Sequence, residues 1–345
     1  MTQTKLTYKD AGVDIDSGNQ ATARIKKLVK STYNKKVLSE VGAFGGFYSG
    51  RFAGYKKPVL ISSADGVGTK LKLAFMTGIH DTIGEDLVNH CTNDILVHGA
   101  LPLYFLDYFA TGKLKPGVVE QVITGLARGC KNNNCSLIGG EIAEMPGFYR
   151  RAEYDLAGFI VGIVDRSRII DGGKIKPGHV IIGLESSGLH TNGYSLVRKL
   201  FFDRLKYPPS RRIPELGGTL AEELLKVHRS YLKVIKRLLV VVSIKGLAHI
   251  TGGGIPGNLV RILPAGCRAV VDTAGWQRGA IFDLIQKLGS VDDNEMYRTF
   301  NMGIGMIVVC GKKDADRVIR LCRRNDVTAN VVGEIVKGGR QVILR

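Results

Sequence analysis

The sequence lacks the cysteine pairs that mark a structural metal site or a redox motif. Its six cysteines are scattered along the chain, and no two of them are separated by only two residues. This spacing argues against a metal site built on cysteine. It predicts buried, reduced thiols of the kind found in cytosolic proteins.

Long hydrophobic runs are missing as well. The longest apolar stretch, around residues 238–243, is far shorter than the roughly 18 residues that a membrane helix needs. Polar residues follow Met1, without the charged and apolar pattern of a secretory signal. We therefore expect a cytoplasmic protein with no membrane partner.

Two common nucleotide-binding motifs are also missing. No Gly-x-x-x-x-Gly-Lys-Ser/Thr segment is present, which argues against a P-loop. No Gly-x-Gly-x-x-Gly segment follows a predicted strand with an acidic residue at the required distance, so a dinucleotide cofactor is unsupported. The chain also shows no repeat of fixed period.

Acidic residues are few relative to basic ones. The chain has 49 Lys and Arg against 31 Asp and Glu, a net charge of +18, which suggests an anionic partner. Basic residues gather at 24–36, 198–212 and 312–324, but they form no long polybasic tail. We favour a solvated basic surface without a nucleic-acid partner. A nucleic-acid-binding protein is an alternative that rests on charge alone, and salt-sensitive DNA binding without ATPase chemistry would support it.

The length of 345 residues and the 44% hydrophobic content predict two domains. Strand and helix patterns alternate in both halves, as in a two-domain α/β or α+β protein. A segment rich in Gly, Pro and Lys at 171–178 places the boundary, giving domains 1–170 and 171–345.

The predicted elements follow from hydrophobic periodicity and turn residues. Predicted strands cover 58–64, 103–110, 136–139, 156–164, 179–184, 246–251, 268–272, 303–309 and 328–336. Predicted helices cover 85–98, 117–132, a segment from Tyr194, a long amphipathic segment at 220–239, then 258–263, 280–288 and 312–324.

The segment from Asp65 to Lys70 carries the first chemical signal. A predicted strand delivers a carboxylate, two glycines and a lysine to one loop. Glycines let backbone N–H groups approach a phosphate, lysine supplies positive charge, and the carboxylate suits Mg²⁺. A plain glycine-rich turn is the alternative. A second glycine cluster, Gly42–Gly46, is either a lid over a nucleotide or a hairpin loop.

Two further carboxylates are candidates for the same ion. Asp94 lies in a predicted helix beside Cys91 and Ile95, where a carboxylate is costly unless it is paired, capped or bound to a cation. Asp65 and Asp94 together would satisfy the protein's share of an Mg²⁺ site. Glu141, at a predicted strand end, is a third candidate. A surface position or an ion pair is the alternative for each carboxylate.

The second half contributes two polar loops. Hydroxyls, an amide and the His190 imidazole gather in the segment 186–193 directly after a strand. A single histidine is more often structural, but its companions here favour function. The Thr251–Gly254 segment precedes a predicted helix and is either a phosphate cradle or an ordinary tight connection.

Taken in order, these segments resemble one family, the aminoimidazole ribonucleotide synthetases (phosphoribosylformylglycinamidine cyclo-ligases). The resemblance runs from about residue 8 to residue 336. It rests on segments 8–18, 65–70, 86–89, 93–94, 105–113, 139–147, 186–195, 249–254 and 295–301.

The resemblance implies an ATP-dependent ring closure in purine biosynthesis. ATP would phosphorylate the formyl amide oxygen of formylglycinamidine ribonucleotide, and an amidine nitrogen would then displace phosphate to form aminoimidazole ribonucleotide. It also implies a homodimer. The N-terminal sheet would form a barrel across the dimer, the C-terminal domain would be an α/β sandwich, and the site would lie between the domains.

The resemblance also assigns roles to residues. His190 and Lys26 are the implied catalytic residues, and Asp65, Asp94 and Glu141 the implied Mg²⁺ ligands. The implied ATP-binding residues are Gly42, Gly45, Gly46, Asp65, Gly66, Gly68, Thr69, Lys70 and Asp94. The implied ribonucleotide-binding residues are Ser187, Asn192, Thr251, Gly252 and Gly253.

Three positions depart from the family pattern, namely Ile142, Thr191 and Gly279, where Thr, Ser and Pro are expected. None removes a charged candidate. Selenophosphate synthetase, thiamine monophosphate kinase and formylglycinamidine ribonucleotide synthetase share the expected architecture. The first carries a reactive residue near its N-terminus, whereas the first cysteine here is Cys91. The kinase would lack segments 186–195 and 295–301, and the last enzyme is much longer.

Overall fold

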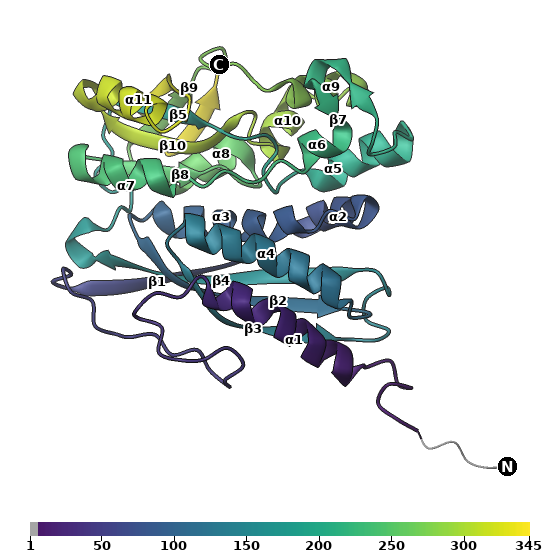
Figure 1. Ribbon diagram of the computed structural model, residues 1–345. Helices are drawn as coiled ribbons and strands as arrows, with labels where there is room; N and C mark the ends of the chain where they lie inside the picture. Colours follow the sequence, from purple (N-terminus) through teal and green to yellow (C-terminus); the bar gives the residue numbers. More distant parts are fainter. Residues whose placement is uncertain (1–5) are drawn as a thin grey trace. The chain divides into compact units, whose positions relative to one another are not determined.

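The computed structural model describes residues 6–345 (Figure 1). The chain forms two compact units that interleave in sequence. The first contains the residues up to 54 together with 62–91 and 102–162, and the second contains 55–61, 92–101 and 163–345. Two short segments of the first half thus belong to the second unit.

A four-stranded sheet forms the base of the first unit. Its strand order is β1 (Pro58–Gly66), β4 (Tyr154–Asp165), β2 (Leu101–Thr111) and β3 (Ser136–Glu144). Strands β2 and β3 run parallel, with Asp107 opposite Gly140. Burial alternates along β4, where Leu156 and Ile160 are buried and Phe159 is 43% exposed, so one face of the sheet is covered.

Two helices, α3 (Asp81–Leu96) and α4 (Pro116–Asn132), pack together over this sheet (Figure 1). Their backbones nearly touch, because a Cβ on Gly84 would lie 2.2 Å from the Val122 carbonyl oxygen. A Cβ on Gly125 would likewise lie 2.2 Å from the Asp81 carbonyl oxygen. Any larger residue at these two positions would push the helices apart.

The first helix, α1 (Ile15–Lys30), was not predicted from the sequence, and neither were α2 (Leu71–Thr77), α10 (Asp293–Thr299) and the last strand β12 (Gln341–Leu344). The Asp14 side chain caps α1 by accepting a hydrogen bond from the Ser17 N–H at 3.2 Å. The helix buries only the narrow face of Ala21, Ile25 and Val29, so its composition is mostly polar.

A six-stranded sheet forms the second unit. Its order is β12, β9 (Cys267–Val271), β11 (Ala329–Lys337), β5 (His179–Glu185), β10 (Ile304–Gly311) and β8 (Gly246–His249). All neighbours are antiparallel except β12 and β9. Two helices, α7 (Leu232–Val241) and α11 (Ala315–Arg323), share one buried cluster with this sheet, including Ile235, Leu238, Val318, Leu184 and Val308.

Shorter elements surround the ends of these strands. They are α5 (Tyr194–Arg198), which continues into a π-helical turn at Lys199–Arg204, the hairpin of β6 (Arg212–Ile213) and β7 (Gly218–Thr219), α8 (Gly254–Leu259), α9 (Ala280–Gly289) and α10. Helix α8 begins four residues before its predicted start, because the glycines of the preceding loop turn directly into it.

The predicted long helix at 220–239 is wrong. The structure has α6 (Leu220–Leu224) and α7, separated by an irregular segment. Side chains of other segments form hydrogen bonds with backbone groups of this irregular segment. Ser187 Oγ donates to the Val227 carbonyl at 2.6 Å, and Asn93 contacts the Arg229 carbonyl and the Tyr231 N–H at 2.8 and 3.0 Å. These bonds replace the helical ones and turn His228 inward.

All six cysteines are buried and none forms a disulfide, as predicted. Within residues 6–345, none of the helices has the length and apolar character required to cross a bilayer.

Candidate functional site

Strand β1 ends at the predicted phosphate loop of the first unit. Asp65 is exposed at this end, and its carboxylate lies 2.6 Å from Nε2 of His90 on α3. The other carboxylate oxygen accepts the Gly66 N–H at 2.7 Å. Gly68 and Thr69 are exposed in the following helical turn. The loop therefore presents a carboxylate and exposed backbone at one strand end.

Lys70 differs from the phosphate contact expected of it. Its side chain is fully buried, and Nζ lies 2.9 and 2.8 Å from the two carboxylate oxygens of Asp86, which is also fully buried. Burial lowers the pKa of Lys70, and the neighbouring Asp86 carboxylate partly offsets that effect. The buried pair therefore anchors the end of the loop in the core. The ion pair with Asp86 was not predicted from the sequence.

The Gly42–Gly46 segment lies close to the end of helix α1. Lys30 forms an ion pair with Glu40, two residues before this segment. The Lys30 ammonium lowers the pKa of Glu40, with a smaller contribution from Lys26. Lys26 is exposed on α1, and Gly42 has a positive φ of 94°, which favours glycine. Lys26 thus lies near Glu40, two residues before the glycine segment.

Strand β3 carries Glu141, the third carboxylate, which is exposed and lies opposite Tyr108 in the β2–β3 register. The neighbouring register pair contains Asp107, which is 7% exposed. Burial raises the pKa of Asp107 to about 7. Asp107 lies in segment 105–113, one of the segments that carry the family resemblance, but no role was predicted for it.

In the second unit, His190 adopts a strained backbone conformation with φ of +60°. Its ring is 1% exposed, and Nε2 accepts the Ser187 N–H at 3.2 Å. It stacks on His228, with ring centroids 3.9 Å apart and an interplanar angle of 22°. The predicted site residues Ser187 and His190 are therefore in contact, and His228 joins them.

A chain of polar contacts continues from His228. Its Nε2 lies 3.0 Å from Nε2 of His249, whose Nδ1 lies 2.9 Å from the Asp94 carboxylate. On the other side, Nδ1 of His228 lies 3.3 Å from Oγ1 of Thr191. Asp94, predicted as a metal ligand, is 27% exposed at one end of this chain. No role was predicted for either His228 or His249. The sequence signal for His249 is its position two residues before the Thr251–Gly254 loop.

The second glycine loop lies close to the same segment. A Cβ on Gly252 would come 3.3 Å from Oδ1 of Asn192, so these two predicted ribonucleotide-binding residues are neighbours. Asn258 holds the loop, because its side-chain amide donates to the carbonyls of Thr251, Gly252 and Gly254 at 2.9–3.3 Å. The loop is thus fixed by a side chain beneath it.

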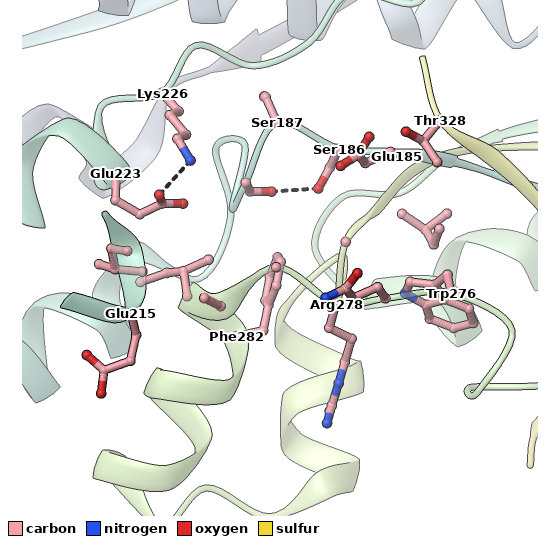
Figure 2. A pocket seen from close by; sticks show the side chains of 18 of the residues that line it. Glu185, Ser186, Ser187, Glu215, Glu223, Lys226, Trp276, Arg278, Phe282 and Thr328 are labelled. Carbon is pink, nitrogen blue, oxygen red and sulfur yellow. Dashed lines mark hydrogen bonds and ion pairs between the residues drawn. The ribbon is translucent and has the colours of Figure 1, made fainter. Parts of the chain in front are cut away.

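A cavity of about 560 Å³ opens beside the 186–190 loop (Figure 2). Ser187 lies at its wall, close to an ion pair between Lys226 and Glu223 at 2.6 Å. Phe282 and Trp276 supply aromatic surface, and the indole N–H donates to the Met302 carbonyl at 2.8 Å. Gly279, one of the atypical positions, also lines the cavity. The volume suits a small organic ligand.

Family models match both halves of the chain. The AIR synthase related protein N-terminal domain matches residues 53–164, and the corresponding C-terminal domain matches residues 176–344. Two solved structures show the same fold. They are thiamine-monophosphate kinase from Stenotrophomonas maltophilia (TM-score 0.67, 15% identity, 93% of this chain and 95% of that one) and hydrogenase maturation protein HypE in complex with ATP (TM-score 0.66, 16% identity, 93% and 90%).

Curated relatives are far more similar in sequence. Phosphoribosylformylglycinamidine cyclo-ligase from Citrifermentans bemidjiense is 53% identical, covering 98% of this chain and 97% of its own. The enzyme of the same name from Geotalea daltonii is 54% identical with the same coverage. The ordered motifs, the two family domains and this near full-length identity together show that the chain belongs to the phosphoribosylformylglycinamidine cyclo-ligase family of ATP-dependent ligases.

Proposed function

We propose that this chain converts formylglycinamidine ribonucleotide to aminoimidazole ribonucleotide with ATP, in purine biosynthesis. The identity above 50% with cyclo-ligases over nearly the whole chain carries this proposal. The resemblance to thiamine-monophosphate kinase is only 15% in sequence and supports the fold alone.

The reaction proceeds in two steps. The formyl amide oxygen attacks the γ-phosphorus of ATP, so that an O–P bond forms and ADP leaves. An amidine nitrogen then attacks the formyl carbon, the C–O bond breaks, phosphate leaves, and the nitrogen loses its proton. Phosphorylation is needed because an amide oxygen is a poor leaving group. The protein's tasks are therefore positioning, charge neutralisation and exclusion of water.

Asp65 in the first unit and Asp94 in the second each suit Mg²⁺ by their donor chemistry. Both are partly exposed carboxylates, and a histidine side chain contacts one oxygen of each. Hard carboxylate oxygens are the ligands that Mg²⁺ prefers, and Glu141 is a third candidate. When bound, the ion would neutralise charge on the ATP phosphates. Gly66, Gly68 and Thr69 would contact those phosphates, with the Gly42–Gly46 segment and Lys26 as further ATP contacts.

His190 is the proposed catalytic group of the second unit. Its backbone strain and its burial against His228, which belongs to a network of polar contacts, support a functional rather than a merely structural role. It would stabilise developing charge or move the proton released in ring closure. Ser187, Asn192 and the Thr251–Gly253 loop would hold the ribonucleotide, and the cavity beside Ser187 offers room for part of it.

The proposal is tested by incubating the protein with formylglycinamidine ribonucleotide and Mg²⁺–ATP and quantifying products by mass spectrometry. We expect aminoimidazole ribonucleotide, ADP and phosphate in equal amounts. Thiamine monophosphate with ATP serves as the matched control substrate. A protein that forms no ribonucleotide product at saturating substrates, or that phosphorylates the thiamine compound instead, contradicts the proposal.

We also propose a homodimer formed through the sheet of the first unit. The face of β4 that α3 and α4 leave uncovered carries Ala157, Phe159 and Val161, and Phe159 is 43% exposed. An exposed apolar strand face of this kind is typical of an interface. Light scattering at micromolar concentration tests the proposal, and a monomer would contradict it.

A further inference from the structure

The three histidines of the second unit form a compact buried group. His190, His228 and His249 are 1%, 0% and 6% exposed, and one nitrogen of each lies within 4.8 Å of the others. A set of three imidazoles is a common metal-binding arrangement. The geometry of the rings decides whether it is one here.

The stacking of His190 on His228 is incompatible with a shared ion. A metal bound to an imidazole lies close to the plane of that ring, about 2.0–2.1 Å from the nitrogen. These two rings face one another with centroids 3.9 Å apart and planes only 22° apart. Nearly parallel planes at this separation do not meet within bonding distance of both nitrogens. The contact between the rings is therefore a stack, and it needs another explanation.

The orientation of His228 is fixed by its neighbours. Asn93 Oδ1 accepts the Tyr231 N–H at 3.0 Å, which sets the amide so that Nδ2 faces His228 Nε2 at 3.2 Å. His249 approaches the same nitrogen at 3.0 Å, and Thr191 approaches the opposite one at 3.3 Å. Polar contacts at both nitrogens hold the ring in one plane.

The His190 ring is confined between this plane and the backbone of β10. A Cβ built on Gly305 would lie 2.5 Å from Cε1 of His190 and 2.1 Å from the Tyr231 hydroxyl oxygen. The Ser187 N–H meets Nε2 from a third direction. His190 lies face to face with His228, whereas its contact with the Tyr231 ring is tilted by 56° at a centroid distance of 6.3 Å. His228 thus determines the tilt of the His190 ring.

We propose that His228 is a positioning residue for His190, a stacked imidazole, held by Asn93, Thr191 and His249, that fixes the catalytic ring for ring closure. This inference rests on the proposed function, because it assumes that His190 acts in that reaction. Small errors in the placement of a reacting group reduce kcat by up to about 100-fold, whereas ATP binding by other residues is unaffected.

Three variants separate the stack from the polar contacts. His228→Leu removes both, His228→Gln keeps an amide but no ring, and His228→Phe keeps a flat ring but no nitrogen. We expect kcat to fall roughly 10- to 100-fold in the Leu and Gln variants, with KM for ATP within about twofold. The Phe variant should recover at least part of kcat. His179→Gln, at the opposite end of β5, is the matched control and should behave as wild type.

The outcomes are distinguishable. A folded Leu variant with wild-type kcat, or a Phe variant no better than Leu, overturns the inference. An inactive wild-type protein refutes the proposed function itself, and a fully active His190→Ala variant refutes only the catalytic role of His190. If the His228 variants do not fold, NMR of the wild-type protein decides. Stacking predicts upfield-shifted His190 ring protons, and unshifted ones refute it. One zinc ion per chain, lost in the Gln variant, would also overturn the stacking explanation.

Discussion

Replacing Asp86 by Asn should destabilise the first unit strongly, because it leaves the Lys70 ammonium without its ion-pair partner. Both side chains are fully buried, and Nζ lies 2.8–2.9 Å from the two carboxylate oxygens. Breaking a buried pair by removing one charge typically costs about 3–5 kcal/mol. For a domain of this size, that corresponds to a fall in Tm of roughly 6–20 °C.

The pH dependence gives the reasoning a second test. Burial already lowers the pKa of Lys70 in the presence of Asp86, and without the carboxylate it should fall further. Between the lowered folded-state pKa and the unfolded value near 10.4, the unfolded chain binds more protons than the folded one. Stability therefore rises with pH across that window. The Asn variant should regain part of its lost stability as pH rises from 7 towards 10.

Urea unfolding at several pH values measures both effects. The double variant Lys70→Met with Asp86→Leu should be much more stable than either single variant, because no charge remains buried. The control Lys72→Met, two residues after Lys70, removes a partly exposed ion pair with Glu153. It should lower the free energy of unfolding by no more than about 1 kcal/mol. If Asp86→Asn costs as little as Lys72→Met, or loses stability as pH rises, the explanation fails.

Other parts of the structure lead to further predictions. Gly305→Ala should lower kcat sharply and reduce the free energy of unfolding by about 1–3 kcal/mol, because its Cβ would overlap Tyr231 and His190. The control Gly257→Ala places its Cβ in open space and should change neither quantity. Steady-state kinetics and urea unfolding measure both variants. Asp94→Asn should raise the Mg²⁺–ATP requirement in steady-state assays, and unchanged kinetics would remove Asp94 from the metal site. Asp107 has a pKa raised to about 7, so its folded form binds the extra proton and stability falls as pH rises from 4 to 7. Asp107→Asn should flatten that part of the stability curve. Phe159→Glu should shift light-scattering mass towards the monomer, with the exposed Val240→Glu as control.

Much of the fold could be predicted because most strands carry their own signal. The apolar runs that became β4, β5 and β10 are bounded by glycine or polar residues, and their predicted ends lie within two residues of the observed ones. The exposed position of Asp65 at the end of β1 follows from the same pattern. Helix α1 was missed because only three of its side chains are buried, which leaves little hydrophobic periodicity to detect.

The candidate site was harder to predict, because its contacts join distant segments. The sequence identified Asp94 and His190 separately, but His228 and His249 complete the network between them. Lys70 also shows the limit of a motif. A lysine after two glycines suggests a phosphate contact. In the structure, however, the Lys70 ammonium is buried and contacts the Asp86 carboxylate. The spacing of residues in the motif predicts neither the burial of Lys70 nor its ion pair with Asp86.

The broken helix shows why the most informative error fell beside the site. Residues 220–239 have good amphipathic periodicity, so local preference favours a continuous helix. Helix α6 ends at Leu224, although the Leu225 N–H still bonds to the Ala221 carbonyl. Bonds from Ser187 and Asn93 then reach the backbone of Val227, Arg229 and Tyr231. The positive φ of His190 is a second departure from local preference, and it lies directly against the same segment. Departures from local preference of this kind concentrate at functional sites, and here two of them meet at one contact. Both departures occur where His190 and His228 stack. The stacked pair is therefore the structural feature that accounts for them together.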